Sequence, residues 1–217
     1  MKNNDFNYPL YINLNNKACL VVGGGGVAER KVQGLLAANA SVTIIAPEIT
    51  PALRTLVSAG KIIWQERTFI CGDTDGFFLV IGATSISAVN EVIAMEAERK
   101  GQLCNIVDAP NQGNFITPGA VRLGSLLLTV STGGSAALTK AVVQELRQYY
   151  NEDFILFTEF IITMRQKVKV LVPSSQKRTI IWRQIITPEL LQLVHNGNLE
   201  EAKEYVNNAI DSFGPQS

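Results

Sequence analysis

A glycine-rich turn near the start of the chain has the residue types and spacing to hold the phosphates of a dinucleotide. Gly23, Gly25 and Ala28 match the pattern G-x-G-x-x-G/A, which follows the apolar run Ala18–Val22 and opens an expected helix over Val27–Asn39. The first glycine allows a tight turn, the second lets a pyrophosphate approach the backbone, and the small third residue lets helix and strand pack closely. The helix N-terminus then offers N–H groups and a partial positive charge to the phosphates.

An acidic residue stands where dinucleotide-binding proteins hold the adenosine ribose. A second apolar run, Ser41–Ile45, is followed by Glu48, about 20 residues beyond Ala28. A carboxylate here accepts hydrogen bonds from ribose hydroxyls, although Glu48 could instead cap a helix that begins near Thr50. Residues 41–51 contain no Arg or Lys to receive a 2′-phosphate, which favours NAD over NADP.

Strands and helices alternate through the first half of the chain and position these residues. Strands are expected at Ala18–Val22, Ser41–Ile45, Lys61–Gln65, Phe77–Ile81 and Leu103–Val107, and helices at Val27–Asn39, Pro51–Ala59 and Ile86–Lys100. This rhythm predicts an α/β fold, a Rossmann-type doubly wound parallel sheet with right-handed crossovers, over residues 1–113. Sites in such sheets lie at the carboxyl ends of the strands. Those ends are Gly23–Gly26, Ala46–Glu48, Gly82–Ser85 and Asp108–Gln112.

The pattern changes after the fifth strand. Two strand-like runs, Asn114–Thr117 and Ser125–Ser131, have no room for a crossover helix between them, and a helix to about Tyr150 follows. Two short strands and one helix cannot bury both faces alone, so residues 114–150 are predicted to be a small α+β dimerisation region that pairs across a two-fold axis. Residues 151–217 are predicted to be a helical C-terminal part. Breaks between its helices are expected at Pro173, Pro188 and Gly197-Asn198.

Basic residues are concentrated in the middle of the chain. The whole sequence has a net charge of zero, but residues 114–186 carry nine basic and four acidic residues, a net charge of +5. Beside a dinucleotide site, such a segment indicates an anionic ligand, and a merely solvated helical surface is the alternative. Arg30 and Lys31, in the first helix, are interpreted as part of a solvated face.

Composition excludes several classes of protein. Apolar residues make up 47% of the chain and charged residues 18%, and the polar start Met1–Asn7 lacks the apolar core of a secretory signal. We expect a cytoplasmic protein with neither a membrane nor a nucleic acid among its partners. Cys19, Cys71 and Cys104 lack C-x-x-C spacing and are predicted to be reduced, buried thiols. His195, the only histidine, is expected on a helix surface, and no metal site is predicted.

Several longer motifs occur in the order and spacing of one known family. They are Tyr8-Pro9-Leu10, Val21-Val22-Gly23-Gly24-Gly25-Gly26-Val27-Ala28-Glu29-Arg30-Lys31, Ala83-Thr84, Cys104-Asn105-Ile106-Val107-Asp108-Ala109-Pro110 and Ser131-Thr132-Gly133-Gly134. On these motifs the chain resembles the precorrin-2 dehydrogenase/sirohydrochlorin ferrochelatase family. This family forms the N-terminal half of bacterial siroheme synthases and also occurs as stand-alone proteins. The resemblance covers roughly residues 8–150, and without a methyltransferase half the chain is more similar to the stand-alone form.

The resemblance implies an activity and a set of contacts. The family uses NAD to oxidise precorrin-2, a tetrapyrrole, to sirohydrochlorin, and some members also insert ferrous iron to give siroheme. Its fold has a Rossmann domain, a dimerisation region and a helical C-terminal part, which implies a homodimer here. Its essential aspartate falls on Asp108. The expected cofactor contacts are Gly25, Gly26, Val27, Pro47 and Glu48, together with Gly23 and Thr84.

The chain departs from the family pattern in two places. Thr132 stands where some relatives carry a regulatory phosphoserine, which puts that control in doubt here. Ser85 replaces a frequent Asp after Ala83-Thr84, which leaves an acid role at that position unsupported.

Oxidation of a tetrapyrrole needs a hydride acceptor and a base for a proton. The cofactor accepts the hydride, and Asp108 at the end of the fifth strand faces the nicotinamide half by topology, so we expect it to take the proton. Otherwise Asp108 only starts the turn into Ala109-Pro110. Asn105 is expected to orient the substrate or Asp108, with an inward polar strand residue as the alternative.

Residues that bind the carboxylates of the substrate are expected between residues 114 and 150. The basic candidates, which are otherwise solvated or dimer-interface charges, are Arg122, Lys140 and Arg147. A strand-to-helix turn whose N–H groups suit a carboxylate is formed by Ser131, Thr132 and Gly133. Helix capping by Thr132 or Ser135 is the alternative for that turn.

Two other functions are weighed against an NAD-dependent precorrin-2 dehydrogenase. A non-enzymatic NAD-sensing Rossmann module needs neither a strand-end base nor a basic segment. A dehydrogenase for a small hydroxy acid is disfavoured, because such enzymes usually employ a catalytic histidine and this chain has only His195.

Overall fold

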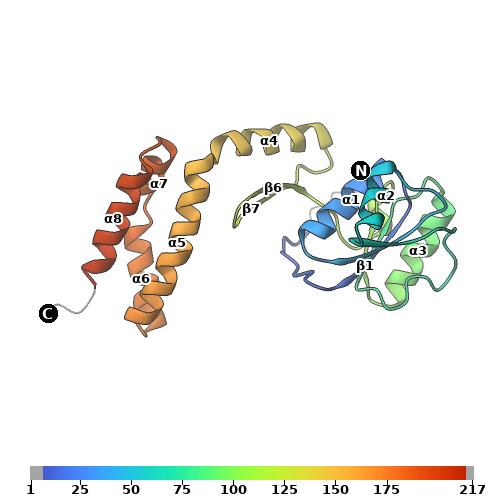
Figure 1. Ribbon diagram of the computed structural model, residues 1–217, viewed down its shortest axis with the longest axis horizontal. Helices are drawn as coiled ribbons and strands as arrows, with labels where there is room; N and C mark the ends of the chain where they lie inside the picture. The colour runs from blue at the N-terminus through green and yellow to red at the C-terminus, as the bar shows by residue number, and fades with distance from the viewer. Residues whose placement is uncertain (1–6, 214–217) are drawn as a thin grey trace. The chain divides into compact units, whose positions relative to one another are not determined.

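The structure is a computed structural model that describes residues 7–213. The chain divides into two compact units, residues 1–117 and 118–217. Figure 1 labels the helices and strands of both units. The polar start predicted for Met1–Asn7 lies outside the described residues except for Asn7.

The first unit is built on a five-stranded parallel sheet with the strand order β3-β2-β1-β4-β5. Its strands are β1 (Ala18–Val22), β2 (Ser41–Ile45), β3 (Ile62–Gln65), β4 (Leu79–Gly82) and β5 (Leu103–Ile106). The register pairs Val22 with Ile45 and with Gly82, and Gly82 with Ile106. The loops after β1, β2, β4 and β5 therefore leave the sheet at the same edge, as predicted for a doubly wound sheet.

Helices cover both faces of this sheet. They are α1 (Gly26–Ala37), α2 (Pro51–Ser58) and α3 (Ser87–Arg99). Alternate strand residues face opposite sides, so Val21 packs in a core with α1 and α2, whereas Leu20 packs in a core with α3. Burial on both faces explains why the strands are continuous apolar runs in the sequence. The Rossmann-type prediction is confirmed.

The connection from β3 to β4 is a loop that Glu96 on α3 holds in place. Glu96 is 7% exposed and accepts hydrogen bonds from the Gly72 N–H at 2.6 Å and the Thr74 hydroxyl at 2.7 Å. Burial by itself raises the pKa of Glu96, but hydrogen bonds from Cys71, Thr74 and Gly72, and the charge of Lys100, lower it to about 2. An ionised buried carboxylate thus organises a loop for which the sequence pattern predicted nothing.

Two predictions for the first unit are wrong in detail. Asn114–Thr117 is not a strand: the Asn114 side chain accepts from the Cys104 N–H at 2.9 Å and donates to the Gln102 carbonyl at 2.7 Å, so a side chain replaces part of a strand ladder beside β5. Cys71 is exposed, whereas Cys19 and Cys104 are buried, and burial raises the pKa of both buried thiols to about 11. All three thiols are free, as predicted.

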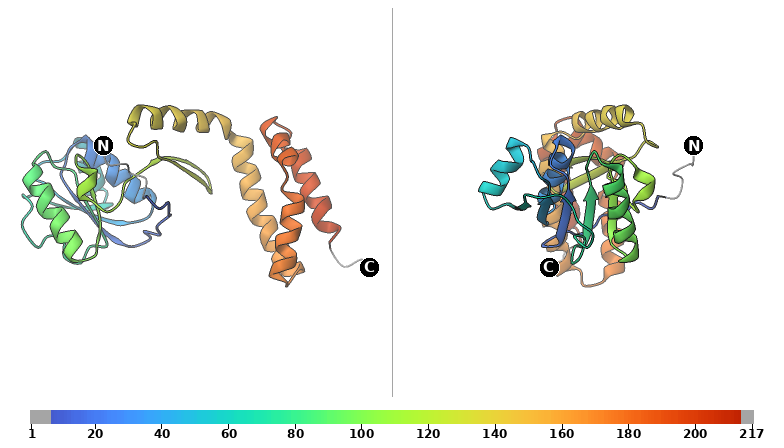
Figure 2. Two further views of the ribbon diagram at one scale, coloured as in Figure 1. Left: turned by 180° about the vertical axis from the view of Figure 1, so that it is seen from behind. Right: turned by 90° about the vertical axis from the view of Figure 1, so that its right-hand side faces the viewer.

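The second unit combines a hairpin, a helix and a helical bundle. The antiparallel strands β6 (Gly119–Leu123) and β7 (Leu126–Val130) are followed by α4 (Ala136–Tyr149). The bundle consists of α5 (Glu152–Leu171), α6 (Ser175–Ile185), α7 (Pro188–His195) and α8 (Leu199–Asp211), with an apolar core of its own. These four helices lie side by side in both Figure 1 and Figure 2.

The helix boundaries in this unit follow from local chemistry. Asn151, Ser174 and Thr187 each cap a helix by accepting a backbone N–H, and Pro188 occupies the first position of α7. The breaks predicted at Pro173, Pro188 and Gly197-Asn198 are confirmed. No helix in residues 7–213 is long and apolar enough to cross a bilayer.

Candidate functional site

The first two glycines of the turn after β1 are required by packing. Gly23 has a φ of +121°, and a Cβ there would lie 2.3 Å from the Ala83 carbonyl oxygen. A Cβ on Gly24 would lie 1.8 Å from the Glu48 carbonyl oxygen. The loops after β2 and β4 therefore press against this turn, which gives Gly24 a role that the fingerprint alone did not assign.

The next two glycines face open space at the start of α1. Apart from adjacent residues and the backbone of α1 itself, no described heavy atom lies within 4 Å of a Cβ built on Gly25 or Gly26. Gly25 is the N-cap of α1, and no described side chain caps this helix, whereas Thr50 caps α2. The first turn of α1, including Val27, thus presents backbone N–H groups to a space that no described side chain fills. This arrangement fits the pyrophosphate of a dinucleotide.

Glu48 lies beside this turn and does not cap a helix. The Thr50 hydroxyl oxygen accepts from the Leu53 N–H at 3.3 Å and is the N-cap of α2, so the capping alternative for Glu48 is wrong. Pro47 and Glu48 are both exposed at the end of β2. The Glu48 carboxylate is therefore available for a ligand, and its contact with a ribose stays a prediction.

Asp108 is held by a residue that the sequence reasoning missed. Asn90, which is 1% exposed, donates from Nδ2 to Asp108 Oδ1 at 2.9 Å and to the Thr84 carbonyl at 3.1 Å. The Thr84 hydroxyl in turn donates to Asn90 Oδ1 at 2.9 Å. Asn90 joins the loop after β4 to the loop after β5. Its position on the buried face of α3, with Ile93 and Ala97 at helical spacing, was the available signal.

Asn105 does not orient Asp108 through a direct contact. It is buried on β5, accepts from Lys31 Nζ at 3.1 Å and donates to the Phe115 carbonyl at 3.0 Å. Lys31 also donates to the Thr117 hydroxyl. Burial, followed by the charge of Arg30, lowers the pKa of Lys31. The prediction of a solvated Lys31 is therefore wrong, while Arg30 is exposed as predicted.

The other predicted substrate contacts belong to the second unit. Arg122, Lys140 and Arg147 are exposed. In the turn Ser131–Gly133, the Thr132 hydroxyl donates to the Ser135 carbonyl at 2.8 Å, and the Ser135 hydroxyl accepts from the Leu138 N–H. Ser135 thus caps α4, which confirms the capping alternative for that residue. A substrate role for this turn and for the three basic residues stays a prediction.

His195 lies in an aromatic cluster rather than on an open helix surface. Its ring is half-buried, stacks on Phe154 at 4.9 Å between centroids and contacts Tyr149 at 4.2 Å. The expectation of a surface residue is wrong, because α7 packs against α5 at this point. Within residues 7–213, no group of three or more His, Cys, Asp or Glu side chains is placed to hold a metal ion.

Comparison with known proteins agrees with this geometry. A family model described as "Putative NAD(P)-binding" matches residues 10–119, and one described as "Sirohaem synthase dimerisation region" matches residues 156–210. The siroheme synthases of Methylobacillus flagellatus and Methylococcus capsulatus are each 32% identical to the chain, over 95% and 96% of it. The chain belongs to the precorrin-2 dehydrogenase and siroheme synthase family.

Relatives in this family differ in length. The chain spans 44% of the length of those two siroheme synthases. The solved structure of SirC, described as a precorrin-2 dehydrogenase, matches 93% of this chain and 98% of its own, with a TM-score of 0.77 and 26% identity. The NAD(P)-binding match confirms the predicted class of cofactor. The dimerisation match covers the bundle, so dimer contacts by residues 114–150, and the boundaries at 113 and 150, stay predictions.

Proposed function

We propose that the chain is an NAD-dependent dehydrogenase that oxidises precorrin-2 to sirohydrochlorin. The observation that carries the proposal is a carboxylate, Asp108, held by buried Asn90 at the same sheet edge as the uncapped glycine turn. The similarity to SirC over almost its whole length supports this reaction, as do the siroheme synthases. A precorrin-2 oxidation therefore accounts for both the fold and the placed base.

Different residues of the first unit bind the cofactor and accept the proton. Bound NAD would supply the hydride acceptor. The N–H groups at the start of α1 hold its pyrophosphate, and Glu48 accepts from its ribose. Asn90 donates to Asp108 Oδ1, and no described residue donates a hydrogen bond to Oδ2. Asp108 Oδ2 is thus free to take the proton that leaves the tetrapyrrole.

The two alternative functions account for less of the structure. An NAD-sensing module needs the glycine turn but no carboxylate positioned by a buried amide. A hydroxy-acid dehydrogenase needs a histidine at the cofactor, and His195 instead packs among aromatic rings of the second unit. Ferrous iron insertion, the second activity of the family, stays a prediction, in which Asp108 would also accept pyrrole protons.

We further propose a homodimer in the cytoplasm. α4 is amphipathic but has no buried residue, and its Leu138 is 53% exposed, so a second copy of the chain would cover this apolar face. The match to a dimerisation region supports the same assembly. Three free thiols, one of them exposed, suit a reducing compartment. Light scattering coupled to gel filtration should give twice the chain mass.

The central experiment mixes precorrin-2, NAD and the protein and follows the absorbance of sirohydrochlorin. Parallel reactions contain ferrous or cobaltous ions to detect metal insertion. Formation of sirohydrochlorin that depends on both NAD and protein is expected. NAD binding without any oxidation would instead favour the sensing module.

A further inference from the structure

A second place suited to an anionic ligand lies in the helical bundle, apart in sequence from the glycine turn and Asp108. A cavity of about 690 Å³ opens between α5 and α6. This volume falls within the range of about 300–1,000 Å³ that small-molecule pockets span. Its lining residues are Arg165, Gln166, Lys169, Ser175, Arg178, Thr179, Trp182, Arg183 and Ile186.

The lining is strongly cationic and carries no acid. Its four basic residues form no ion pair with any residue in 7–213, whereas Lys167 on the same helix α5 pairs with Asp211 at 3.1 Å. Four cations gathered without a compensating carboxylate repel one another and attract an anion. This cluster accounts for four of the nine basic residues in the segment 114–186.

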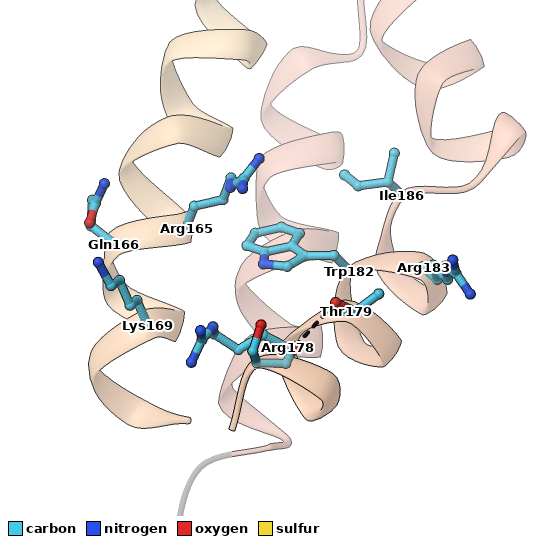
Figure 3. Close-up of a pocket in the computed structure, with 9 residues that line it drawn as sticks. Arg165, Gln166, Lys169, Arg178, Thr179, Trp182, Arg183 and Ile186 are labelled. Atoms are coloured by element: carbon cyan, nitrogen blue, oxygen red, sulfur yellow. Dashed lines mark hydrogen bonds between the residues drawn. The ribbon is translucent and has the colours of Figure 1, made fainter. Parts of the chain in front are cut away.

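Part of this cluster is fixed in place before any ligand binds. Arg178 Nη1 donates to the carbonyls of Val172 at 2.8 Å and Pro173 at 2.6 Å, which anchors its guanidinium at the C-terminus of α5. Trp182 is half-buried on α6, where its neighbours Ile181 and Ile185 are buried in the bundle core. Figure 3 shows the Trp182 indole between the two helices, with Arg165 extending from α5 toward it.

An indole surrounded by cations selects the shape of the ligand as well as its charge. A small anion such as phosphate would engage one or two of the basic residues and leave the face of Trp182 unused. A planar ring with carboxylates around its edge can stack on the indole and reach several cations at once. Polar hydroxyls from Ser175 and Thr179 complete the lining.

We propose that the α5–α6 pocket is a second binding site for a polycarboxylate tetrapyrrole, separate from the site at Asp108. The choice of tetrapyrrole rests on the proposed function, because substrate and product of that reaction are rings of this kind. The site would retain a tetrapyrrole on the protein in addition to the one undergoing oxidation. It involves binding alone and no chemical step.

Calorimetric titration of the full chain with uroporphyrin, a stable porphyrin with carboxylates around its ring, tests the proposal. We expect two porphyrins per chain, falling to one in the double variant Arg165→Ala/Lys169→Ala. Both side chains are exposed, so the variant should fold normally. The control variant Lys177→Ala removes an exposed lysine of α6 that does not line the cavity. This variant should still bind two porphyrins per chain. In the wild-type protein, the affinity of the α5–α6 pocket for uroporphyrin should fall as the salt concentration is raised.

Other outcomes separate this proposal from the proposed function. The pocket assignment would be overturned if the double variant still bound two porphyrins per chain, or if Lys177→Ala also bound only one. ATP binding at the same cations as tightly as uroporphyrin would overturn the choice of a tetrapyrrole. If the wild-type protein does not oxidise precorrin-2 but binds two porphyrins per chain, the proposed function is refuted and the pocket is supported. The double variant should oxidise precorrin-2 at the wild-type rate with saturating substrate.

Discussion

The two units differ in where they place their polar groups. All five buried polar or charged residues in the described chain lie in the first unit: Thr74, Asn90, Glu96, Gln102 and Asn105. Among the described residues of the second unit the buried core is apolar, and four of the basic residues of this unit line a surface cavity. Hydrogen bonds fix the orientation of a buried polar side chain, as they do for Asn90 and Asn105, whereas Gln102 Oε1 has no partner among the described residues. The first unit is therefore built to orient reacting groups, and the second to present charge.

Among tests of the orienting role of the first unit, removal of the base Asp108 should have the largest effect. Asp108→Ala is expected to reduce precorrin-2 oxidation by about 10²–10⁴-fold, the range that a positioned general base contributes. NAD affinity should remain nearly unchanged, because the glycine turn is untouched. Steady-state rates and an NAD titration measure the two effects. Glu98→Ala, which removes an exposed carboxylate from α3, is the control, and normal turnover by Asp108→Ala would exclude this residue from the mechanism.

A change at the glycine turn should separate cofactor binding from folding. Gly25→Asp places bulk and negative charge where the pyrophosphate would lie, and we expect NAD affinity to fall about 100-fold through like-charge repulsion. No described atom obstructs a side chain at this position, so the protein should still fold. The matched control is Gly34→Asp, an exposed position later in α1 with equally open surroundings. Undiminished NAD affinity in Gly25→Asp would refute the pyrophosphate placement.

Acid should destabilise the first unit before the second. The pKa of Glu96 is lowered from 4.5 to about 2, so its stabilisation is complete above pH 4.5 and disappears as the pH falls toward 2. Such a shift is worth on the order of 3 kcal/mol. Each unit contains one tryptophan, Trp64 or Trp182, and single Trp→Phe variants let fluorescence follow each unit separately.

The acid experiment has its own control variant. Glu96→Gln should remove most of the pH dependence of the Trp64 transition while leaving the Trp182 transition unaltered. Identical acid transitions for Glu96→Gln and wild type would show that another group controls the stability of the first unit.

The smallest expected effect concerns the residue that positions Asp108. Asn90→Ala removes the hydrogen bond to Asp108 Oδ1, and we expect kcat to fall about tenfold with little change in the KM for NAD, because an unpositioned base is less effective. Loss of a buried hydrogen-bonding partner should also lower stability by about 1–3 kcal/mol. Glu91→Ala, an exposed neighbour on α3, should do neither. A reduced stability with unchanged kcat would assign Asn90 a purely structural role.

Short-range patterns were enough to predict the architecture of the first unit and one end of its site. The glycine spacing, the strand before it and the helix after it act within about 15 residues, so periodicity and turn chemistry determine them. Asp108 lies two residues beyond the end of β5, at the expected edge. The prediction failed at Asn114–Thr117, where an asparagine side chain satisfies backbone groups that a strand would otherwise pair.

The sequence by itself determined which residues lie at the carboxyl edge of the sheet, because alternating strands and helices predict a parallel sheet whose strands all end at one edge. Only the tertiary structure decided which side chains touch there: Asn90 reaches Asp108 across 18 residues, and Lys31 reaches Asn105 across 74. The cationic cavity likewise exists only where α5 and α6 pack together. Such contacts depend on the packing of separate elements, which no local pattern in a single sequence encodes.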